Sequence, residues 1–252
     1  IIESGAVLVS RLGQIFRQGV GSEITVAAHR ILAGEIPESP PSGAKDADFY
    51  FIEKDDPEDI VAIMRALVAE RIPKRFGLQP KEDVQVLTPM HRGPLGASGL
   101  NDTMARLLNP HRGDRRLAVG DKVMQVRNNY DKEVFNGDVG FIERLAADGK
   151  TFVVRFERRV VTYEPQDQDQ LVPAWAITIH KSQGSEYPAV VIPVHTQHFM
   201  MLRRNLIYTA VTRGKRLVVL VGSRRALGIA VREAGATPRF GRLAERLKEL
   251  VR

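Results

Sequence analysis

The sequence contains no cysteine among its 252 residues. Disulfide bonds and thiolate metal sites are therefore excluded, and the absence suits a reducing compartment. No apolar run approaches the ~18 residues that a transmembrane helix needs, and the first residues lack the basic and apolar segments of a signal peptide. The first residue is also not methionine. We expect a cytoplasmic protein with no membrane partner, whose chain begins inside a longer polypeptide.

Positive charge exceeds negative charge, with 37 Lys and Arg against 30 Asp and Glu and a net charge of +7. A basic surface favours polyanions, because neutralising phosphates releases condensed counterions. The basic residues are mostly arginine, which binds phosphate in a bidentate manner. Charge alone remains weak evidence, since many basic proteins bind no nucleic acid.

Residues 1–111 alternate between helical and strand patterns. Helices are predicted after a cap at Ser22, from the Asp56-Pro57-Glu58 start signal, and from a cap at Ser98 to Leu108. Short strands are predicted at residues 49–52 and 84–88. This rhythm predicts an α/β fold with a parallel sheet covered by helices.

The pattern changes between residues 112 and 172. Short β patterns are separated by the hairpin signals Asn136-Gly137 and Asp148-Gly149. Five short strands in so few residues predict a small β-barrel inserted into the α/β domain. The α/β pattern returns over residues 173–252, where two apolar runs, 189–192 and 217–221, predict strands buried on both faces.

An amphipathic helix ends the chain. Leu243, Leu247 and Leu250 recur at helical spacing in a basic segment. The spacing favours packing of these leucines on the core over a surface that meets another protein.

Polar side chains crowd the segment that follows the predicted strand near residue 177. His180, Lys181, Ser182, Gln183 and Glu186 lie within a few residues of one another. Parallel α/β sheets bind their ligands at strand ends of this kind. On this segment alone, a polar loop that only satisfies its own backbone is an equally good interpretation.

A second segment, residues 206–216, predicts a helix that ends in a cationic turn, with Gly214 as its C-cap. One interpretation of Arg213 is that it stabilises the helix dipole. The other is that it contacts a nucleotide phosphate, where an arginine can accelerate phosphoryl transfer by ~10³ or more. A third segment contains Arg17, which alone would be interpreted as a surface cation.

In this order, the three segments resemble motifs of superfamily 1 helicases. Phe16-Arg17-Gln18 resembles motif IV, residues 178–186 resemble motif V, and residues 208–213 resemble motif VI. Residues 88–96, and residues 120–140 with Asn128-Asn129-Tyr130 and Asn136-Gly137-Asp138, resemble segments of the RecD branch. The resemblance implies a second RecA-like domain, formed by residues 1–111 and 173–252, with a Src-homology-3-like (SH3-like) barrel at 112–172.

Two RecA-like domains bind ATP and Mg²⁺ between them in that family. The resemblance implies that Arg17 and Arg213 act catalytically on the γ-phosphate, and that Gln183, Gly184 and Glu186 complete the ATP-binding set. No Walker A motif G-x-x-x-x-G-K-[ST] and no acidic Walker B strand occur in the sequence. The phosphate cradle and the Mg²⁺ ligands are therefore expected on an N-terminal RecA-like domain outside this chain, with no metal site here and no ATP hydrolysis by the chain alone.

The resemblance also implies a track for single-stranded DNA. The expected contacts are Thr88, Pro89, His91, Arg92, Asn128, Asn129, Thr178 and His180. Such side chains hold phosphates without reading sequence. A solvated loop histidine is an equal alternative for His91, and hairpin packing is favoured over base stacking for Tyr130. The family implies a monomeric 5′→3′ motor that unwinds duplex in DNA repair and recombination.

Three alternatives stay open. The chain could be the helicase half of a conjugative relaxase, which would carry a Tyr nucleophile and a His metal cluster far upstream. It could be a non-catalytic DNA-binding scaffold, although intact Arg17, Gln183, Glu186 and Arg213 favour a working motor. An RNA-binding protein with a barrel would fit the charge but leaves motifs V and VI unexplained.

Overall fold

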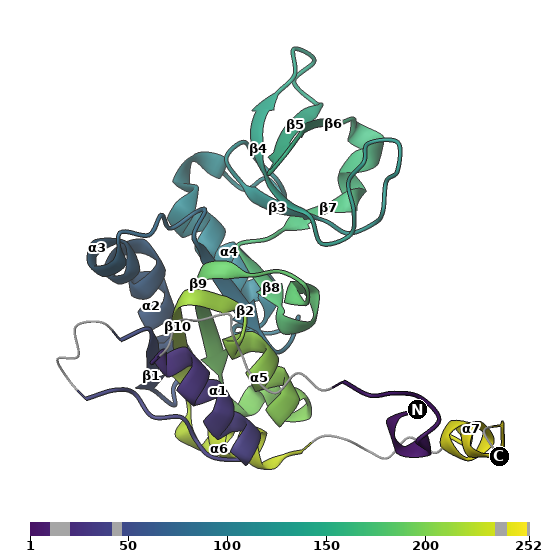
Figure 1. Cartoon of the computed structure of the whole chain (residues 1–252). Coiled ribbons are helices and arrows are strands. Elements are labelled where there is room, and N and C mark those ends of the chain that lie inside the picture. Colours follow the sequence, from purple (N-terminus) through teal and green to yellow (C-terminus); the bar gives the residue numbers. More distant parts are fainter. Residues whose placement is uncertain (11–20, 42–46, 235–240, 251–252) are drawn as a thin grey trace.

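The computed structural model describes residues 1–10, 21–41, 47–234 and 241–250. A five-stranded parallel sheet with helices on both faces forms the lower part of the molecule, and a curled five-stranded antiparallel sheet lies above it (Figure 1). The predicted α/β class with an inserted β unit is confirmed.

The parallel sheet has the strand order β1-β10-β9-β2-β8. Its strands are β1 (Phe49–Glu53), β2 (Val84–Thr88), β8 (Ala176–Thr178), β9 (Tyr187–Val194) and β10 (Gly214–Gly222). The central strands β9 and β10 are the two predicted apolar runs, and their interiors are buried because helices cover both faces.

Two hydrophobic cores lie on the two faces of this sheet. One core packs α1 (Glu23–Ala33), α5 (Arg204–Val211) and α6 (Arg224–Arg232) against it. The other packs α2 (Pro57–Ala66), the π-helical turn η2 (Leu67–Arg71), α3 (Ile72–Phe76) and α4 (Ala97–Leu108). Short helices η1 (Ile2–Ser4), η3 (Pro110–Arg112), η4 (Pro165–Gln170), η5 (Ile179–Ser182) and η6 (Thr196–Met201) occur in the connections.

The predicted start of α2 is confirmed, because the Asp56 carboxylate accepts the backbone N–H groups of Glu58 and Asp59. The predicted cap at Ser98 is wrong. Helix α4 begins at Ala97 after Gly96, and the Ala97 and Ser98 N–H groups donate to the carbonyls of Met90 and His91. The preceding loop thus supplies the acceptors that a side-chain cap would otherwise supply.

Two further helix-end predictions need correction. Ser22 does precede α1, but its hydroxyl donates to Asp48 Oδ2 at 2.5 Å, and Asp48 Oδ1 accepts the Ile24 N–H. Gly214 is not a C-cap, because α5 ends at Val211 with Thr212 as its C-cap and Gly214 already begins β10.

The antiparallel sheet has the order β6-β5-β4-β3-β7 and a separate core. Its strands are β3 (Lys122–Gln125), β4 (Val139–Leu145), β5 (Phe152–Phe156), β6 (Val160–Tyr163) and β7 (Leu171–Pro173). This curled sheet is called the barrel below. The exact domain limits at residues 112 and 172 stay a prediction.

Two buried amide side chains fix the junction between the barrel and the parallel sheet. Gln85 Nε2 donates to the carbonyls of Ala174 and Trp175 at 3.0 and 3.1 Å. Asn101 on α4 donates to the Ala176 carbonyl at 2.7 Å and accepts the Ala176 N–H at 3.0 Å. The short edge strand β8 is therefore held on one side by β2 and on the other by a side chain.

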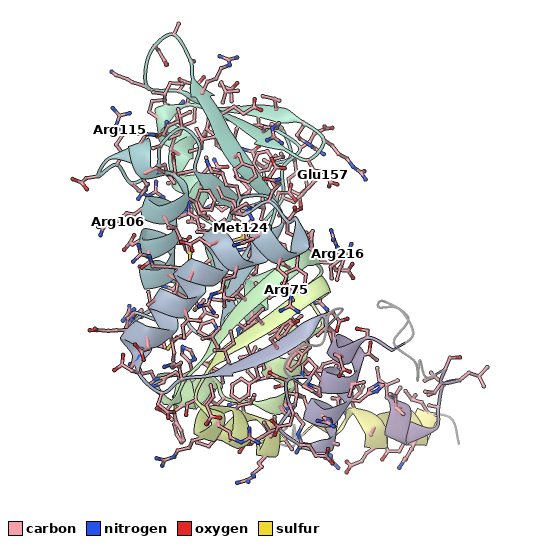
Figure 2. All side chains as sticks on the ribbon, turned by 90° about the vertical axis from the view of Figure 1, so that its left-hand side faces the viewer. Arg75, Arg106, Arg115, Met124, Glu157 and Arg216 are labelled. Carbon is pink, nitrogen blue, oxygen red and sulfur yellow. The ribbon has the colours of Figure 1, made fainter. Side chains whose placement is uncertain are left out.

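Lys122 on β3 is buried at the same junction. Its Nζ lies 3.5 Å from the Val84 carbonyl oxygen and 5.9 Å from the centre of the Phe141 ring. Burial lowers the pKa of Lys122 to about 8, although the charges of Asp83 and Glu82 act in the opposite direction. Met124, two residues along the strand, lies between the barrel and the parallel sheet (Figure 2).

Lys122→Met is expected to be more stable than the wild type at pH 7, by at most about 3 kcal/mol. Below about pH 8 the lysine is charged in both states, and the folded state bears the cost of burying that charge. Between about pH 8 and 10.5 the unfolded chain binds more protons than the folded one, so wild-type stability rises with pH. Urea unfolding at pH 7 and pH 10 should show the difference shrinking, and a pH-independent difference would contradict the assignment.

The terminal helix α7 (Leu243–Leu250) lies beside η1, away from both sheets (Figure 1). The prediction that its leucines pack on the core is wrong for two of them, since Leu243 and Leu250 are 55% and 81% exposed. Among the helices of the described ranges, none has both the length and the apolar character to cross a membrane.

Candidate functional site

Glu186 and Arg213 lie close together where the central strands of the parallel sheet begin. We call this side of the sheet its amino-terminal edge. Tyr187 and Gly214, the first residues of β9 and β10, are partners in the strand register. The Tyr187 N–H also donates to the Arg213 carbonyl at 2.9 Å. The two predicted nucleotide-binding side chains, 27 residues apart in the sequence, therefore lie together at the amino-terminal ends of the two central strands.

The Arg213 side chain is half-buried and held by several acceptors. Its Nε donates to the Thr209 carbonyl at 3.2 Å and its Nη1 to the Ser185 carbonyl at 3.0 Å. Nη2 lies 3.4 Å from the Thr212 hydroxyl. These contacts fix the guanidinium before any ligand arrives, so little rotamer freedom would be lost on binding an anion.

Glu186 forms an ion pair with Lys215 at 3.0 Å, with the Glu186 side chain 26% exposed. Gln183 and Gly184 are exposed in the turn just before it. Gly184 has a φ of 88°, a conformation that glycine adopts without strain. The segment predicted as motif V thus ends in an accessible, charged turn beside Arg213.

A second group of predicted residues lies on the opposite side of the sheet, where β2 and β8 end. We call this side the carboxyl-terminal edge. Thr88 and Thr178 are register partners at the carboxyl ends of β2 and β8. His91, Arg92 and His180 follow these strands and are exposed, while Thr178 is half-buried. Three donors predicted to contact DNA therefore lie on accessible loops at one edge.

A cavity of about 250 Å³ runs from this edge toward the barrel. His91, Thr178 and Lys181 line it at the sheet, and Met124 and Val172 line it at the barrel. The cavity thus joins two of the predicted DNA-contacting residues to the surface of the barrel along edge strand β8.

Two predicted DNA-binding residues are not accessible. Thr88 is completely buried, and its hydroxyl donates to the Leu95 carbonyl at 2.6 Å. Pro89 is also buried. Strand β2 lies inside the sheet, between β9 and β8, so its last residues fold under the loop. Neither residue is accessible to DNA in this structure, and their direct contact with DNA stays a prediction. The observed role of Thr88 is to hold the loop that presents His91 and Arg92.

The segment from residue 179 to residue 186 connects the two edges. The register places the end of β8 and the start of β9 about six strand positions apart, or roughly 20 Å. Ile179 and Ser182 are buried, and η5 packs against α5. His180, Lys181, Gln183 and Gly184 are exposed. We call residues 179–186 the connecting segment.

Asn128 and Asn129 shape a hairpin of the barrel. Asn128 Oδ1 accepts the Asn136 N–H at 2.9 Å, and Asn129 Oδ1 accepts the Lys132 N–H at 3.1 Å. Asn129 Nδ2 donates to Gln170 Oε1 at 3.2 Å. Their contact with DNA stays a prediction, whereas the hydrogen bonds that they accept within the hairpin are present in the structure.

Arg17, predicted as the second catalytic arginine, lies outside the described residues, as do Phe16 and Gln18. Its role therefore stays a prediction. In the described part of the chain, no group of three or more His, Asp or Glu side chains is placed to hold a metal ion.

Two cations in the cavity were not singled out from the sequence. Lys181 lies inside the predicted motif V, and its charge next to His180 was a usable signal. Arg116 lies just before the barrel and donates to the Leu171 carbonyl at 2.7 Å. No local pattern links Arg116 to His91 or Thr178, because the three come together only when the barrel docks on β8.

The chain matches two family models. Residues 173–221 match the UvrD-like helicase C-terminal domain, and residues 100–156 match the SH3 domain of ATP-dependent RecD-like DNA helicases. The first match includes the connecting segment and Arg213, and the second includes the Asn128–Asn129 hairpin.

Curated relatives agree with these matches. The chain is 38% identical over 241 residues to the ATP-dependent RecD2 DNA helicase of Deinococcus radiodurans, covering 92% of this chain and 32% of that protein. It is 29% identical over 158 residues to the RecBCD enzyme subunit RecD of Haemophilus influenzae, covering 60% of this chain and 23% of that protein. The chain thus spans about a third or less of these relatives.

A solved structure shows the same fold. The Pif1 helicase from Bacteroides, crystallised with ADP-AlF3 and single-stranded DNA, superposes with a TM-score of 0.50 at 17% identity, covering 83% of this chain and 51% of that one. At this identity the likeness concerns the fold alone. The predicted architecture, a RecA-like parallel sheet with an inserted SH3-like barrel, is confirmed.

Proposed function

Because this chain corresponds in sequence to the C-terminal region of a RecD-like helicase, we propose that it is one half of an ATP-driven motor that moves along single-stranded DNA and unwinds duplex. The observation that carries the proposal is the connecting segment, residues 179–186. It runs between the edge that holds Glu186 and Arg213 and the edge that holds His91, Arg92 and Thr178. A motor needs such a physical link between its nucleotide site and its DNA site.

At the first edge, Arg213 serves as the arginine that approaches the γ-phosphate of ATP from across a domain cleft. Three protein acceptors already position its guanidinium. A positioned cation stabilises the charge that develops in phosphoryl transfer without reorganising. Gln183, Gly184 and Glu186 form the adjoining surface toward the nucleotide, and Arg17 is proposed as the second arginine.

At the second edge, His91, Arg92, Thr178 and His180 hold DNA phosphates, with Lys181 and Arg116 adding charge along the cavity. These donors recognise the backbone rather than base edges, so binding is expected to be insensitive to sequence and sensitive to salt. When ATP closes the domains, movement of the turn at Gln183 would shift His180 and Thr178 through the connecting segment.

The complete motor requires parts that this chain does not contain. The proposal places the phosphate-binding loop and the Mg²⁺ ligands on an N-terminal RecA-like domain. Mg²⁺ bound there would neutralise phosphate charge. From the family we further propose a monomeric cytoplasmic enzyme, 5′→3′ movement, and a role in DNA repair and recombination.

The test is steady-state ATP hydrolysis by the full-length protein, with and without oligo-dT. We expect at least ten-fold stimulation by single strands, because the connecting segment joins the two edges. Hydrolysis that ignores DNA would contradict the coupling. Absence of hydrolysis with intact DNA binding would favour the scaffold alternative. A Tyr- and His-containing strand-cleaving domain upstream would assign the motor to a relaxase.

A further inference from the structure

The loop between β3 and β4 presents two aromatic rings to solvent. Tyr130 is 74% exposed and Phe135 is 42% exposed. Their ring centres lie 6.0 Å apart with an interplanar angle of 77°. The sequence favoured packing of Tyr130 within the hairpin, and the ring does pack edge-to-face on Phe135, but most of its surface stays exposed. Two adjoining exposed rings form a small apolar patch, and apolar patches rimmed by polar residues can mark binding surfaces.

The backbone that carries the rings is fixed. Asn129 and Val134 form a bridge across the hairpin. Lys132, between them, donates to the Thr162 carbonyl at 2.7 Å and to Asp167 Oδ2 at 2.6 Å. Glu133 has a φ of 51°, and it is the one non-glycine residue with positive φ in the described ranges. Strained backbone that is anchored in this way is typical of functional positions.

A polar cavity adjoins the second ring. Its volume is about 270 Å³, and Phe135, Phe156, Arg158 and Arg159 contribute to its lining together with Asp138 and Glu157. The Arg159 guanidinium donates a hydrogen bond to the Glu133 carbonyl, and the Asp138 carboxylate accepts the Phe135 N–H at 2.8 Å. Arg158 is exposed and forms no ion pair with any described residue. Glu157 lies on the edge of the barrel opposite Arg115 (Figure 2).

We propose that Tyr130 and Phe135 form a stacking platform for a base of single-stranded DNA, with the phosphate of that nucleotide at Arg158. The inference rests on the proposed function and extends its DNA site onto the barrel. Every base has a π-face, so stacking tolerates any sequence and contributes about 1–3 kcal/mol per base. In Figure 1 the loop lies on the same side of the molecule as β8, which lines the cavity described above.

A proline-rich peptide is the other ligand that exposed aromatics on a small barrel suggest. Two observations favour a nucleotide. Arg158 is exposed and lines the cavity beside Phe135, and a neutral polyproline helix offers it no counter-charge. The hairpin is also continuous with Asn128 and Asn129, which belong to the segment that matches the SH3 domain of RecD-like DNA helicases.

The test compares two oligonucleotides of equal length, oligo-dT and a fully abasic deoxyribose-phosphate strand. Binding to the full-length protein without nucleotide is measured by fluorescence anisotropy. Tyr130→Ala and Phe135→Ala are expected to weaken oligo-dT binding by about five-fold to a hundred-fold, with no change for the abasic strand. Tyr130→Phe should keep wild-type affinity, and Arg158→Ala should weaken both strands.

Val160→Ala is the matched control, because Val160 is 59% exposed on β6 of the same barrel and lies outside the hairpin. Equal loss on both strands in Tyr130→Ala, or no loss on either, would overturn the stacking platform while leaving the proposed motor intact. A polyproline peptide that binds the wild type but not Tyr130→Ala, with DNA binding unchanged, would also overturn it. Failure of the wild type to bind oligo-dT would overturn the proposed function itself.

Discussion

Arg213→Ala in the full-length protein is expected to lower kcat for ATP hydrolysis by about 10³-fold or more, the effect typical of arginines that stabilise phosphoryl-transfer charge. Affinity for oligo-dT without nucleotide should stay within about two-fold, because Arg213 lies at the amino-terminal edge of β10, away from His91 and Thr178. Steady-state kinetics and anisotropy, measured on the same preparation, check both halves of the prediction.

Arg213 also has a structural role that the experiment must separate. Its guanidinium bridges the carbonyls of Thr209 and Ser185, so some loss of stability is expected from the substitution. Arg216→Ala is the matched control, because Arg216 is an exposed arginine on β10, three residues after Arg213 (Figure 2). If Arg213→Ala loses hydrolysis and DNA binding in equal measure, the substitution has damaged the fold, and the catalytic assignment fails.

Gly96→Ala is expected to lower the free energy of unfolding by about 3 kcal/mol, through overpacking and broken hydrogen bonds. A Cβ atom at this position would lie 2.2 Å from the Arg92 carbonyl oxygen and 2.7 Å from that of His91. Both are backbone atoms, so the loop itself must move. That movement breaks the bonds from the Ala97 and Ser98 N–H groups that begin α4.

The same substitution is expected to weaken binding of single-stranded DNA, since the displaced loop carries His91 and Arg92. Gly93→Ala is the control from the same loop. Gly93 has a φ of 91°, but an added Cβ would meet no atom within 4 Å. Its cost is the conformational one of about 1 kcal/mol. Stability is measured by thermal unfolding and DNA affinity by anisotropy. If both variants lose the same stability and the same affinity, the close approach of the Arg92 and His91 carbonyls to Gly96 affects neither property.

The sequence was sufficient to predict the parallel sheet and to single out the segments that form the candidate site. Strands β9 and β10 are near-continuous apolar runs, a pattern typical of strands that are buried on both faces. The segment that resembles motif V could also be recognised locally, because several polar side chains follow a strand within a few residues. The structure explains why: residues 179–186 cross between two edges of the sheet, with buried Ile179 and Ser182 beneath an exposed polar side.

The failures have a common physical origin in tertiary context. Thr88 resembles an exposed donor at a strand end, but its burial depends on the strand order, which places β2 inside the sheet. Ser98 resembles a helix cap, but backbone carbonyls of the preceding loop already serve the helix. Neither of these relationships is local in sequence.

Asn101 has a consequence for how the protein behaves in solution. Strand β8 is the last strand of the parallel sheet, and a sheet edge normally offers its N–H and C=O groups to any extended chain that approaches. The Asn101 amide occupies both groups of Ala176, in the way that a neighbouring strand would. A single side chain thereby blocks the middle of this edge strand as a template for edge-to-edge association, beside the cavity that we propose binds DNA.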